Sequence, residues 1–318
     1  MKRVFFTGLL AAIVGFIHLN AAMGERGTRA RTVPPTLAER LGYSREAKLL
    51  IVHADDLGMA HSVNAASIKA LEGGLVSSGS IMVPCPWFTE IAEYARSHPE
   101  ADLGLHLTLT SEWNNYRWGP VLSKDRVPSL LDHKGYLFPT EAEAAAKISV
   151  AEAEAEIRAQ ISRARAFGIQ FTHLDSHMGT LYQSKALVET LLRAARDNKV
   201  PVRVSKEWFA SAEYLPSLLG PNAVVLDHIV SIDPEVTPEN WVKYYTEAIK
   251  GLEPGVNELI VHIAYDDAEM RAMTLNHPDW GSAWRQRDFE FVTSELFKRA
   301  LQDNNVKLVT WREIGKLQ

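Results

Sequence analysis

Short apolar runs alternate along this chain with longer segments in which apolar residues recur at helical spacing. The apolar, β-branched runs predict eight strands, at residues 49–53, 76–83, 103–109, 170–174, 200–204, 224–226, 258–264 and 306–310. The amphipathic segments predict helices at residues 61–72, 87–97, 150–167, 184–198, 237–251 and 285–303. Strands and helices therefore follow one another along most of the chain.

Repeated alternation of strand and helix is typical of a parallel sheet with right-handed crossovers. Eight strands over this length favour an α/β fold of the (β/α) barrel type, TIM-like but distorted or incomplete. An open, doubly wound sheet is the alternative. No glycine-rich phosphate-binding motif follows any predicted strand, so a nucleotide cofactor is not indicated.

Residues 111–147 interrupt this alternation and predict an insertion or large loop beside the active end of the barrel. Aromatic side chains on such a loop could stack on sugar rings, and they could equally pack the insertion onto the barrel. The insertion carries five of them, Trp113, Tyr116, Trp118, Tyr136 and Phe138.

The N-terminus has the pattern of a secretory signal peptide. A basic start of three residues precedes an apolar run at 4–17, which is short for a membrane-spanning helix, and Ala22-Met23-Gly24 fits a small-x-small cleavage pattern. We expect a signal peptide at 1–24, a linker at 25–45 and one (β/α) domain at 46–318. The mature protein would be periplasmic or secreted, without stable membrane association; an uncleaved anchor is the alternative.

The amino-acid composition argues against a nucleic-acid partner. The chain has 318 residues, of which 46% are hydrophobic and 23% charged, with a formal net charge of −5. These are ordinary globular values, and no run of Lys or Arg suggests a nucleic-acid partner. Cys85 is the only cysteine, so no internal disulfide is possible. A homodimer is left open.

Polar side chains gather where four of the predicted strands end. In a parallel barrel the catalytic groups lie at the C-terminal ends of the strands, so these side chains would meet at one rim. The strand-end residues are His53, Asp55 and Asp56; His106; His173, Asp175 and His177; and His262.

Two adjacent carboxylates such as Asp55 and Asp56 are costly unless a cation or a shared proton relieves them. One carboxylate and two imidazoles can hold a divalent ion and leave positions open for water and substrate. Such an ion activates water and polarises a carbonyl, while the second carboxylate takes the proton. The pattern indicates a metal-assisted hydrolase of an amide or ester.

Two assignments stay open from the residues alone. In an extended chain His173, Asp175 and His177 share one face, so all three could converge on an ion, or one could bind while the others support it by hydrogen bonds. Arg203, at the end of the strand at 200–204, could hold a carboxylate or form a surface salt bridge.

Four stretches together resemble, in order and spacing, the YdjC-like carbohydrate deacetylases, which include chitooligosaccharide and hopanoid-biosynthesis deacetylases. They are ADDLG at 54–58, GLHLT at 104–108, THLDSH at 172–177 and HIAY at 262–265. The resemblance covers about residues 49–313. It implies a (β/α)-barrel-like fold and a divalent metal that assists removal of acetyl groups from sugars.

The resemblance also implies a role for each residue. Asp55 would be the general base and His262 the general acid or a contact to the leaving group. The ligands of one divalent ion, Mg²⁺ or Zn²⁺, would be Asp56, His106 and His177. Supporting or substrate-contacting roles are left for His53, His173, Asp175 and Arg203.

Two departures from the family pattern concern the substrate. Gly179 stands where the family usually has a second histidine after His177, and Ile263-Ala264 stands where it often has Pro-Gly. We expect a hydrolase of N-acetylated carbohydrate. The alternatives are a non-catalytic glycan-binding protein of the same fold and a hydrolase of a non-sugar amide or ester.

Overall fold

The computed structural model describes residues 34–220 and 223–318. The predicted signal peptide and residues 25–33 of the predicted linker lie outside these ranges. Within the rest of that linker, Leu37–Arg40 form helix α1, whose Leu37 and Ala38 are buried in a small apolar cluster with Leu49 and Trp311. In the described part of the chain, no helix is long and apolar enough to cross a membrane.

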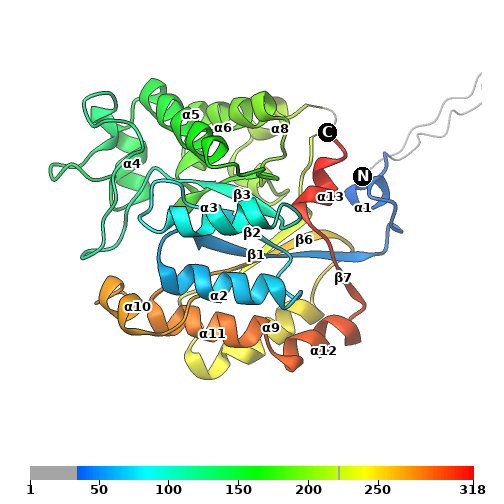
Figure 1. Ribbon diagram of the computed structural model, residues 1–318. Coiled ribbons are helices and arrows are strands. Elements are labelled where there is room, and N and C mark those ends of the chain that lie inside the picture. Colours follow the sequence, from blue (N-terminus) through cyan, green and yellow to red (C-terminus); the bar gives the residue numbers. More distant parts are fainter. Residues whose placement is uncertain (1–33, 221–222) are drawn as a thin grey trace, which may run out of the picture. The chain divides into compact units, whose positions relative to one another are not determined.

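A parallel sheet of seven strands forms the centre of the domain (Figure 1). Its order is β4-β3-β2-β1-β6-β5, and β7 pairs with the first residues of β1. Every pairing is parallel, as predicted. The strands are β1 (Lys48–Leu57), β2 (Ser78–Ile81), β3 (Leu103–Leu107), β4 (Leu174–Ser176), β5 (His228–Ser231), β6 (Gly255–Val261) and β7 (Val306–Leu308).

The sheet curls into a distorted, incomplete (β/α) barrel, which confirms the predicted fold class. Between β4 and β5, the described residues continue the pairing only through the single bridges Leu174↔Val202 and Ser205↔Leu226. The strands predicted at 200–204 and 224–226 are therefore wrong as regular strands. Pro201 has no N–H to donate to a ladder, which limits pairing in the first of them. The sequence also did not predict β5.

Helices flank the strands. In Figure 1, α2, α9, α11 and α12 lie below the strands, α5 and α6 lie above them, and α3 overlaps β2 and β3 in this view. The main helices are α2 (His61–Glu72), α3 (Phe88–Ser97), α5 (Val150–Ala166), α6 (Lys185–Asn198), α9 (Trp241–Lys250), α11 (Ser282–Val292) and α12 (Glu295–Asp303). Shorter ones are α4 (Glu141–Lys147), α7 (Trp208–Ser211), α8 (Leu215–Leu218), α10 (Ala268–Met273) and α13 (Trp311–Gly315), with 3₁₀ turns at Pro128–Leu130, His177–Tyr182 and Pro238–Asn240.

One predicted helix is divided. The segment at 285–303 forms α11 and α12 rather than a single helix. Ser294 lies between them in an extended conformation, and its hydroxyl accepts the N–H of Phe297. This serine cap starts a new helix.

Candidate active site

The end of β1 places Asp55 and Asp56 side by side facing the pocket. In a regular strand, neighbouring side chains point to opposite faces. Here the register of β1 against β2 shifts between Ala54 and Leu57, and Asp56 has φ 73°. A bulge with a left-handed residue re-aims a side chain in this way, so both carboxylates reach one pocket.

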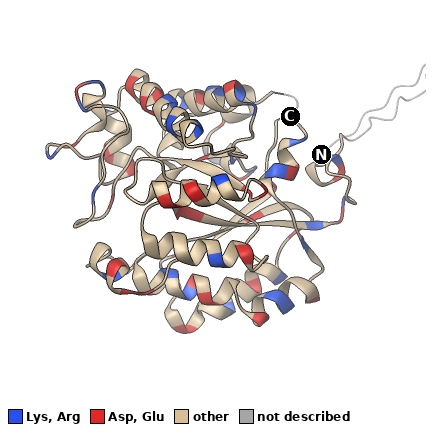
Figure 2. Ribbon diagram, in the orientation of Figure 1, with Lys and Arg blue, Asp and Glu red and all other residues tan. Residues whose placement is uncertain are grey.

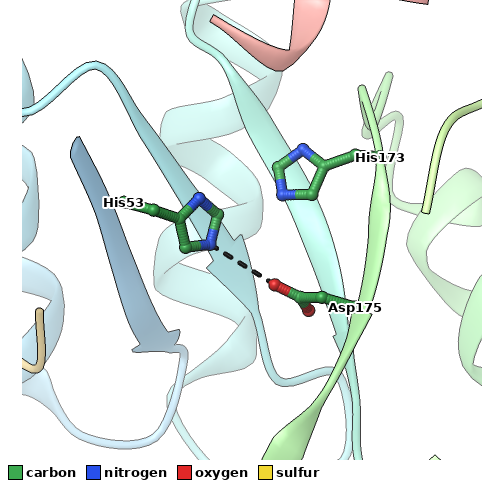
Figure 3. A group of neighbouring side chains, drawn as sticks. All are labelled: His53, His173 and Asp175. Carbon is green, nitrogen blue, oxygen red and sulfur yellow. Dashed lines mark ion pairs between the residues drawn. The ribbon is translucent and has the colours of Figure 1, made fainter. Parts of the chain in front are cut away.

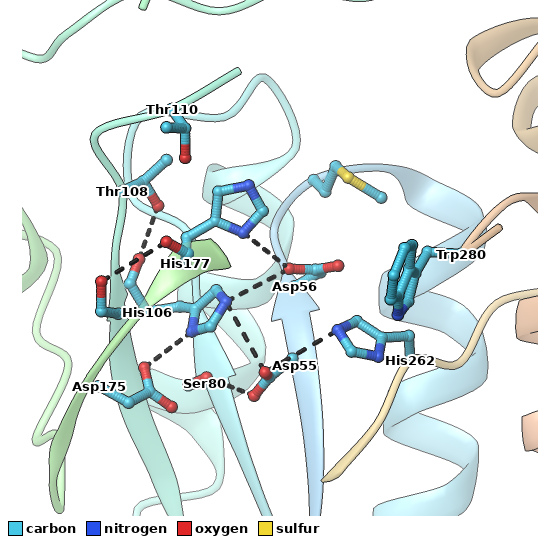
Figure 4. Close-up of polar contacts among 12 residues, drawn as sticks. Asp55, Asp56, Ser80, His106, Thr108, Thr110, Asp175, His177, His262 and Trp280 are labelled. Carbon is cyan, nitrogen blue, oxygen red and sulfur yellow. Dashed lines mark hydrogen bonds and ion pairs between the residues drawn. The ribbon is translucent and has the colours of Figure 1, made fainter. Parts of the chain in front are cut away.

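One oxygen of Asp56 and one nitrogen each of His106 and His177 converge as potential metal ligands. Asp56 Oδ1 lies 3.4 Å from His106 Nε2 and 3.4 Å from His177 Nδ1. The three ligand atoms of this group all lie within 4.8 Å of one another (Figure 4). Asp56 Oδ1 is buried and has no hydrogen-bond partner. An unsatisfied buried carboxylate oxygen between two imidazole nitrogens fits a divalent ion with nitrogen and oxygen ligands.

Each imidazole is oriented by a carboxylate on its other nitrogen. His106 Nδ1 lies 2.8 Å from Asp175 Oδ1, and His177 Nε2 lies 2.9 Å from Glu112 Oε2. Such partners fix the tautomer and turn the opposite nitrogen toward the ligand position. Burial alone would lower the pKa of His177, but Glu112 and Asp56 outweigh it and raise that pKa to about 9. The electrostatics of the site therefore favour added positive charge.

Asp55 is held by a different set of neighbours. Its Oδ1 lies 2.9 Å from Arg203 Nη2 and 3.1 Å from His53 Nε2, and it accepts the Ser80 hydroxyl at 3.3 Å. Its Oδ2 lies 3.8 Å from His106 Nε2. Burial would raise the pKa of Asp55, but Arg203 and His106 hold it well below its usual range. Asp55 is therefore an ionised carboxylate with one oxygen beside the donor cluster.

In the view of Figure 4, His262 lies on the opposite side of Asp56 from His106 and His177, and it lines the same pocket as Trp280. Its Nε2 is 3.9 Å from Asp55 Oδ2. Burial lowers the pKa of His262 to about 4, with a smaller contribution from Arg285. The imidazole is thus neutral near pH 7 and able to accept a proton.

Arg203 forms a buried network of ion pairs with the carboxylates around the site. Arg203 Nη2 lies 2.9 Å from Asp175 Oδ2, and Arg203 Nε lies 2.8 Å from Glu258 Oε2. Arg203 is only 4% exposed, so the surface salt bridge considered for it is wrong. A charge this deeply buried needs paired partners, and three carboxylates supply them here.

His173 does not reach Asp56. Figure 3 shows it beside His53 and Asp175, and its ring stacks on Trp311 at 5.1 Å between centroids. A Cβ on Gly104 would lie 2.4 Å from His173 Nε2, so glycine makes room for the ring. His53, His173 and Asp175 could also group around an ion, but all three are completely buried. His177 is thus the histidine of this motif that lies at the pocket.

The donor cluster opens into a pocket of about 750 Å³. Trp208, Met178 and Trp280 line it, and Met178 and Trp280 are exposed. Of the aromatic residues in the insertion, Trp113 lines the pocket but is buried, as are Trp118 and Phe138. Trp208 and Tyr182 are half-buried in the pocket wall, so Trp280 is the most exposed of the aromatic residues described in its lining, and the sequence did not predict it there.

Three charged residues of the site were missed by the sequence reasoning. Arg285 donates from Nη2 to Asp56 Oδ2 at 2.7 Å, and from Nε to the Trp280 carbonyl at 2.6 Å. Glu112 and Glu258 are the other two. The sequence could have predicted Glu258, because it is a carboxylate in an apolar strand, and a buried carboxylate must be paired with a cation. Glu112 lay in a predicted loop and Arg285 in a predicted helix, and no sequence pattern marked either residue as part of the site.

Known proteins resemble this chain over nearly its whole described length. The sequence model of the family described as YdjC-like protein matches residues 49–303. A carbohydrate deacetylase from Thermus thermophilus is 32% identical over 284 residues, covering 87% of this chain and 97% of that protein. A chitooligosaccharide deacetylase from Yersinia enterocolitica is 26% identical over 290 residues, covering 84% and 99%.

A solved structure agrees in fold. The crystal structure of an Enterococcus faecalis protein, described as a candidate for cellobiose-phosphate cleavage, matches with a TM-score of 0.71 and 26% identity. The match covers 84% of this chain and 99% of that one. The relatives and this structure therefore span the same domain.

Proposed function

The chain belongs to the YdjC-like family, and from this membership and its site we propose that it is a metal-dependent carbohydrate deacetylase. The reaction would hydrolyse the amide of an N-acetylated sugar to an amine and acetate. The observation that carries the proposal is the unsatisfied Asp56 Oδ1, which faces one nitrogen of each of two buried histidines.

Asp56, His106 and His177 would hold one divalent ion. Imidazole donors favour zinc-type ions over Mg²⁺, which prefers oxygen ligands. When bound, such an ion lowers the pKa of water and polarises the acetyl carbonyl. Asp175 and Glu112 would keep both imidazoles aimed at the ligand position.

Asp55 and His262 would move the protons. Asp55 is kept ionised by Arg203 and would take the proton of the attacking water through Oδ2. His262, which is neutral and 3.9 Å from that oxygen, would receive the proton and pass it to the departing nitrogen. This route delivers a proton to the amine although the resting imidazole carries none.

The glycan would be met outside the cytoplasm, because residues 1–24 have the pattern of a secretory signal peptide. We therefore extend the proposal to a periplasmic or secreted enzyme. The chitooligosaccharide and carbohydrate substrates named for the relatives are the first to test.

The decisive experiment combines elemental analysis with acetate release from N-acetylated oligosaccharides. We expect one divalent ion per chain, loss of activity with a chelator, and recovery when a divalent ion is restored. Asp55→Asn should keep the ion and lower kcat about 10²- to 10⁴-fold, since it removes a general base. Asp56→Ala should lose the ion itself.

Two results would contradict the proposal. One is unchanged acetate release in Asp55→Asn. The other is full activity in protein whose metal content is far below one ion per chain. A folded protein that binds these oligosaccharides but releases no acetate would support the glycan-binding alternative.

A further inference from the structure

The charges that line the pocket suggest which sugars it accepts, provided that the proposed deacetylase function is right. The lining residues include five carboxylates but only two guanidinium groups, and no lysine. The C-terminal tip of β1 is visibly acidic in Figure 2. With the divalent ion proposed above, which would add two positive charges to the two guanidinium groups, the five carboxylates leave an excess of one negative charge in the pocket.

Neither guanidinium group is free to bind an anion. Arg203 already faces Asp55, Asp175 and Glu258 at 2.9, 2.9 and 2.8 Å. Arg285 is paired with Asp56 at 2.7 Å. Both arginines are buried, so a phosphate or carboxylate would have to displace a carboxylate partner to reach them.

Two pocket carboxylates differ from the other three in their partners. Glu141 begins α4, and Asp279 lies in the loop before α11. Among the described residues, no Lys, Arg or His forms an ion pair with either, although both line the pocket. Asp279 is exposed and Glu141 is half-buried, so both can meet a ligand.

Trp280 adds an independent preference for positive charge. Its ring lines the pocket at 38% exposure, packs on Trp284 at 5.3 Å, and has its backbone carbonyl bound by Arg285. The face of an indole attracts ammonium groups and repels anions. A fixed, exposed indole therefore favours a sugar that carries a protonated amine over one that carries a phosphate.

We propose that the pocket selects oligosaccharides in which a free amino sugar lies beside the N-acetylated residue that reacts, and that it discriminates against phosphorylated or carboxylated sugars. The amine is the group that the hydrolysis itself produces, with acetate as the other product. Removal of one acetyl group would thus make the same chain a better substrate for the next removal.

The test uses three chitooligosaccharides of one length with the full chain: fully acetylated, with one free amine, and with one phosphate. We expect kcat/KM to be about three- to tenfold higher for the amine than for the fully acetylated chain at low salt. The advantage should shrink at high salt, because screening weakens it. The phosphorylated chain should be the poorest of the three.

Variants assign the effect to residues. The double variant Glu141→Gln and Asp279→Asn should lose the preference for the amine. Glu143→Gln is the matched control, because Glu143 belongs to the same first turn of α4 but does not line the pocket. Its preference and rate should match those of the parent.

Equal rates for the three chains, a preference for the phosphorylated chain, or an unchanged preference in the double variant would overturn this inference and leave the deacetylase function standing. Release of no acetate from any of the three would overturn the proposed function, and this inference with it.

Discussion

Asp55 and Asp56 are adjacent in sequence but have different neighbours. Asp55 is bound by Arg203, whereas Asp56 uses Oδ2 for Arg285 and leaves Oδ1 between two imidazoles. Each carboxylate thus has its own guanidinium group from a different part of the chain. The two aspartates could exchange roles only if both arginines moved, so the arginines decide which carboxylate takes which task.

Glu112 gives a prediction at this scale. It accepts from His177 Nε2 at 2.9 Å, and this contact turns His177 Nδ1 toward Asp56. Glu112→Ala should weaken metal binding about 10- to 100-fold, as is usual when the partner of a ligating histidine is lost. Glu112→Gln keeps an acceptor oxygen and should lose less. Competition with a chelator measures both affinities, and equal affinities in the parent and Glu112→Ala would refute the role.

The sequence predicted most residues of the site because strand ends in a parallel barrel meet at one rim. That rule brought Asp55, Asp56, His106 and His262 together. It could not predict Glu112 or Arg285, which reach the site from a loop and from α11. The course of a loop and the angle of a helix depend on packing, and spacing along the chain does not specify them.

At the scale of elements, β3 depends on a glycine. Gly104 leaves room for the His173 ring, which stacks on Trp311 at the start of α13. Gly104→Ala would place a methyl group 2.4 Å from His173 Nε2, so the ring must shift. We expect the free energy of unfolding in urea to fall by about 1–3 kcal/mol, as for other overpacked cores.

Gly119→Ala is the control for this change. The nearest atom to a Cβ at Gly119 is the Gly135 carbonyl oxygen at 3.8 Å, an ordinary contact. Its free energy of unfolding should change by less than about 0.5 kcal/mol. Equal effects of the two substitutions would show that the close approach of His173 to β3 is not needed.

Asp288 of α11 forms hydrogen bonds to α9 and to the segment after β6, and these contacts depend on pH. It accepts hydrogen bonds from Trp241 and Tyr245 of α9 and from the N–H of His262 after β6. Burial raises its pKa from 3.8 to about 7 in spite of these bonds. The folded protein therefore holds this proton more tightly than the unfolded chain does.

The sign of the pH effect follows from that raised pKa. The stabilisation is complete below pH 3.8 and is lost as the pH rises through about 7. Asp288→Asn cannot titrate, so its free energy of unfolding relative to the parent should improve between pH 4 and pH 7. Denaturation at several pH values measures this difference, and a difference that stays constant with pH would contradict the prediction.

Helices were more predictable than strands for a local reason. The predicted helix at 61–72 matches α2, and the one predicted at 184–198 matches α6, whose N-cap is Ser184. Capping and periodicity are local, so the sequence carries them. The segments at 200–204 and 224–226 look like strands, but their pairing depends on partners far away in the chain.

For the whole molecule, stability must come from packing. Residues 49–57 of β1 are buried, and β1 has neighbours in β2, β6 and β7. Cys85 is buried, and no second cysteine exists to form an internal disulfide. A protein of this kind can fold the same way in reducing and oxidising compartments, so export imposes no redox requirement on its fold.

Export itself is the prediction for the whole molecule. Residues 1–24 should direct the chain out of the cytoplasm, because a basic start precedes a short apolar run and small residues. Intact mass measurement on protein from the cell envelope or medium should show a mature chain that begins near residue 25. Replacing two residues of the apolar run at 4–17 with aspartate should retain the full-length chain in the cytoplasm, with acetate release preserved in the extract. A full-length chain in the envelope would indicate an uncleaved anchor instead, and an unmodified chain in the cytoplasm would refute export.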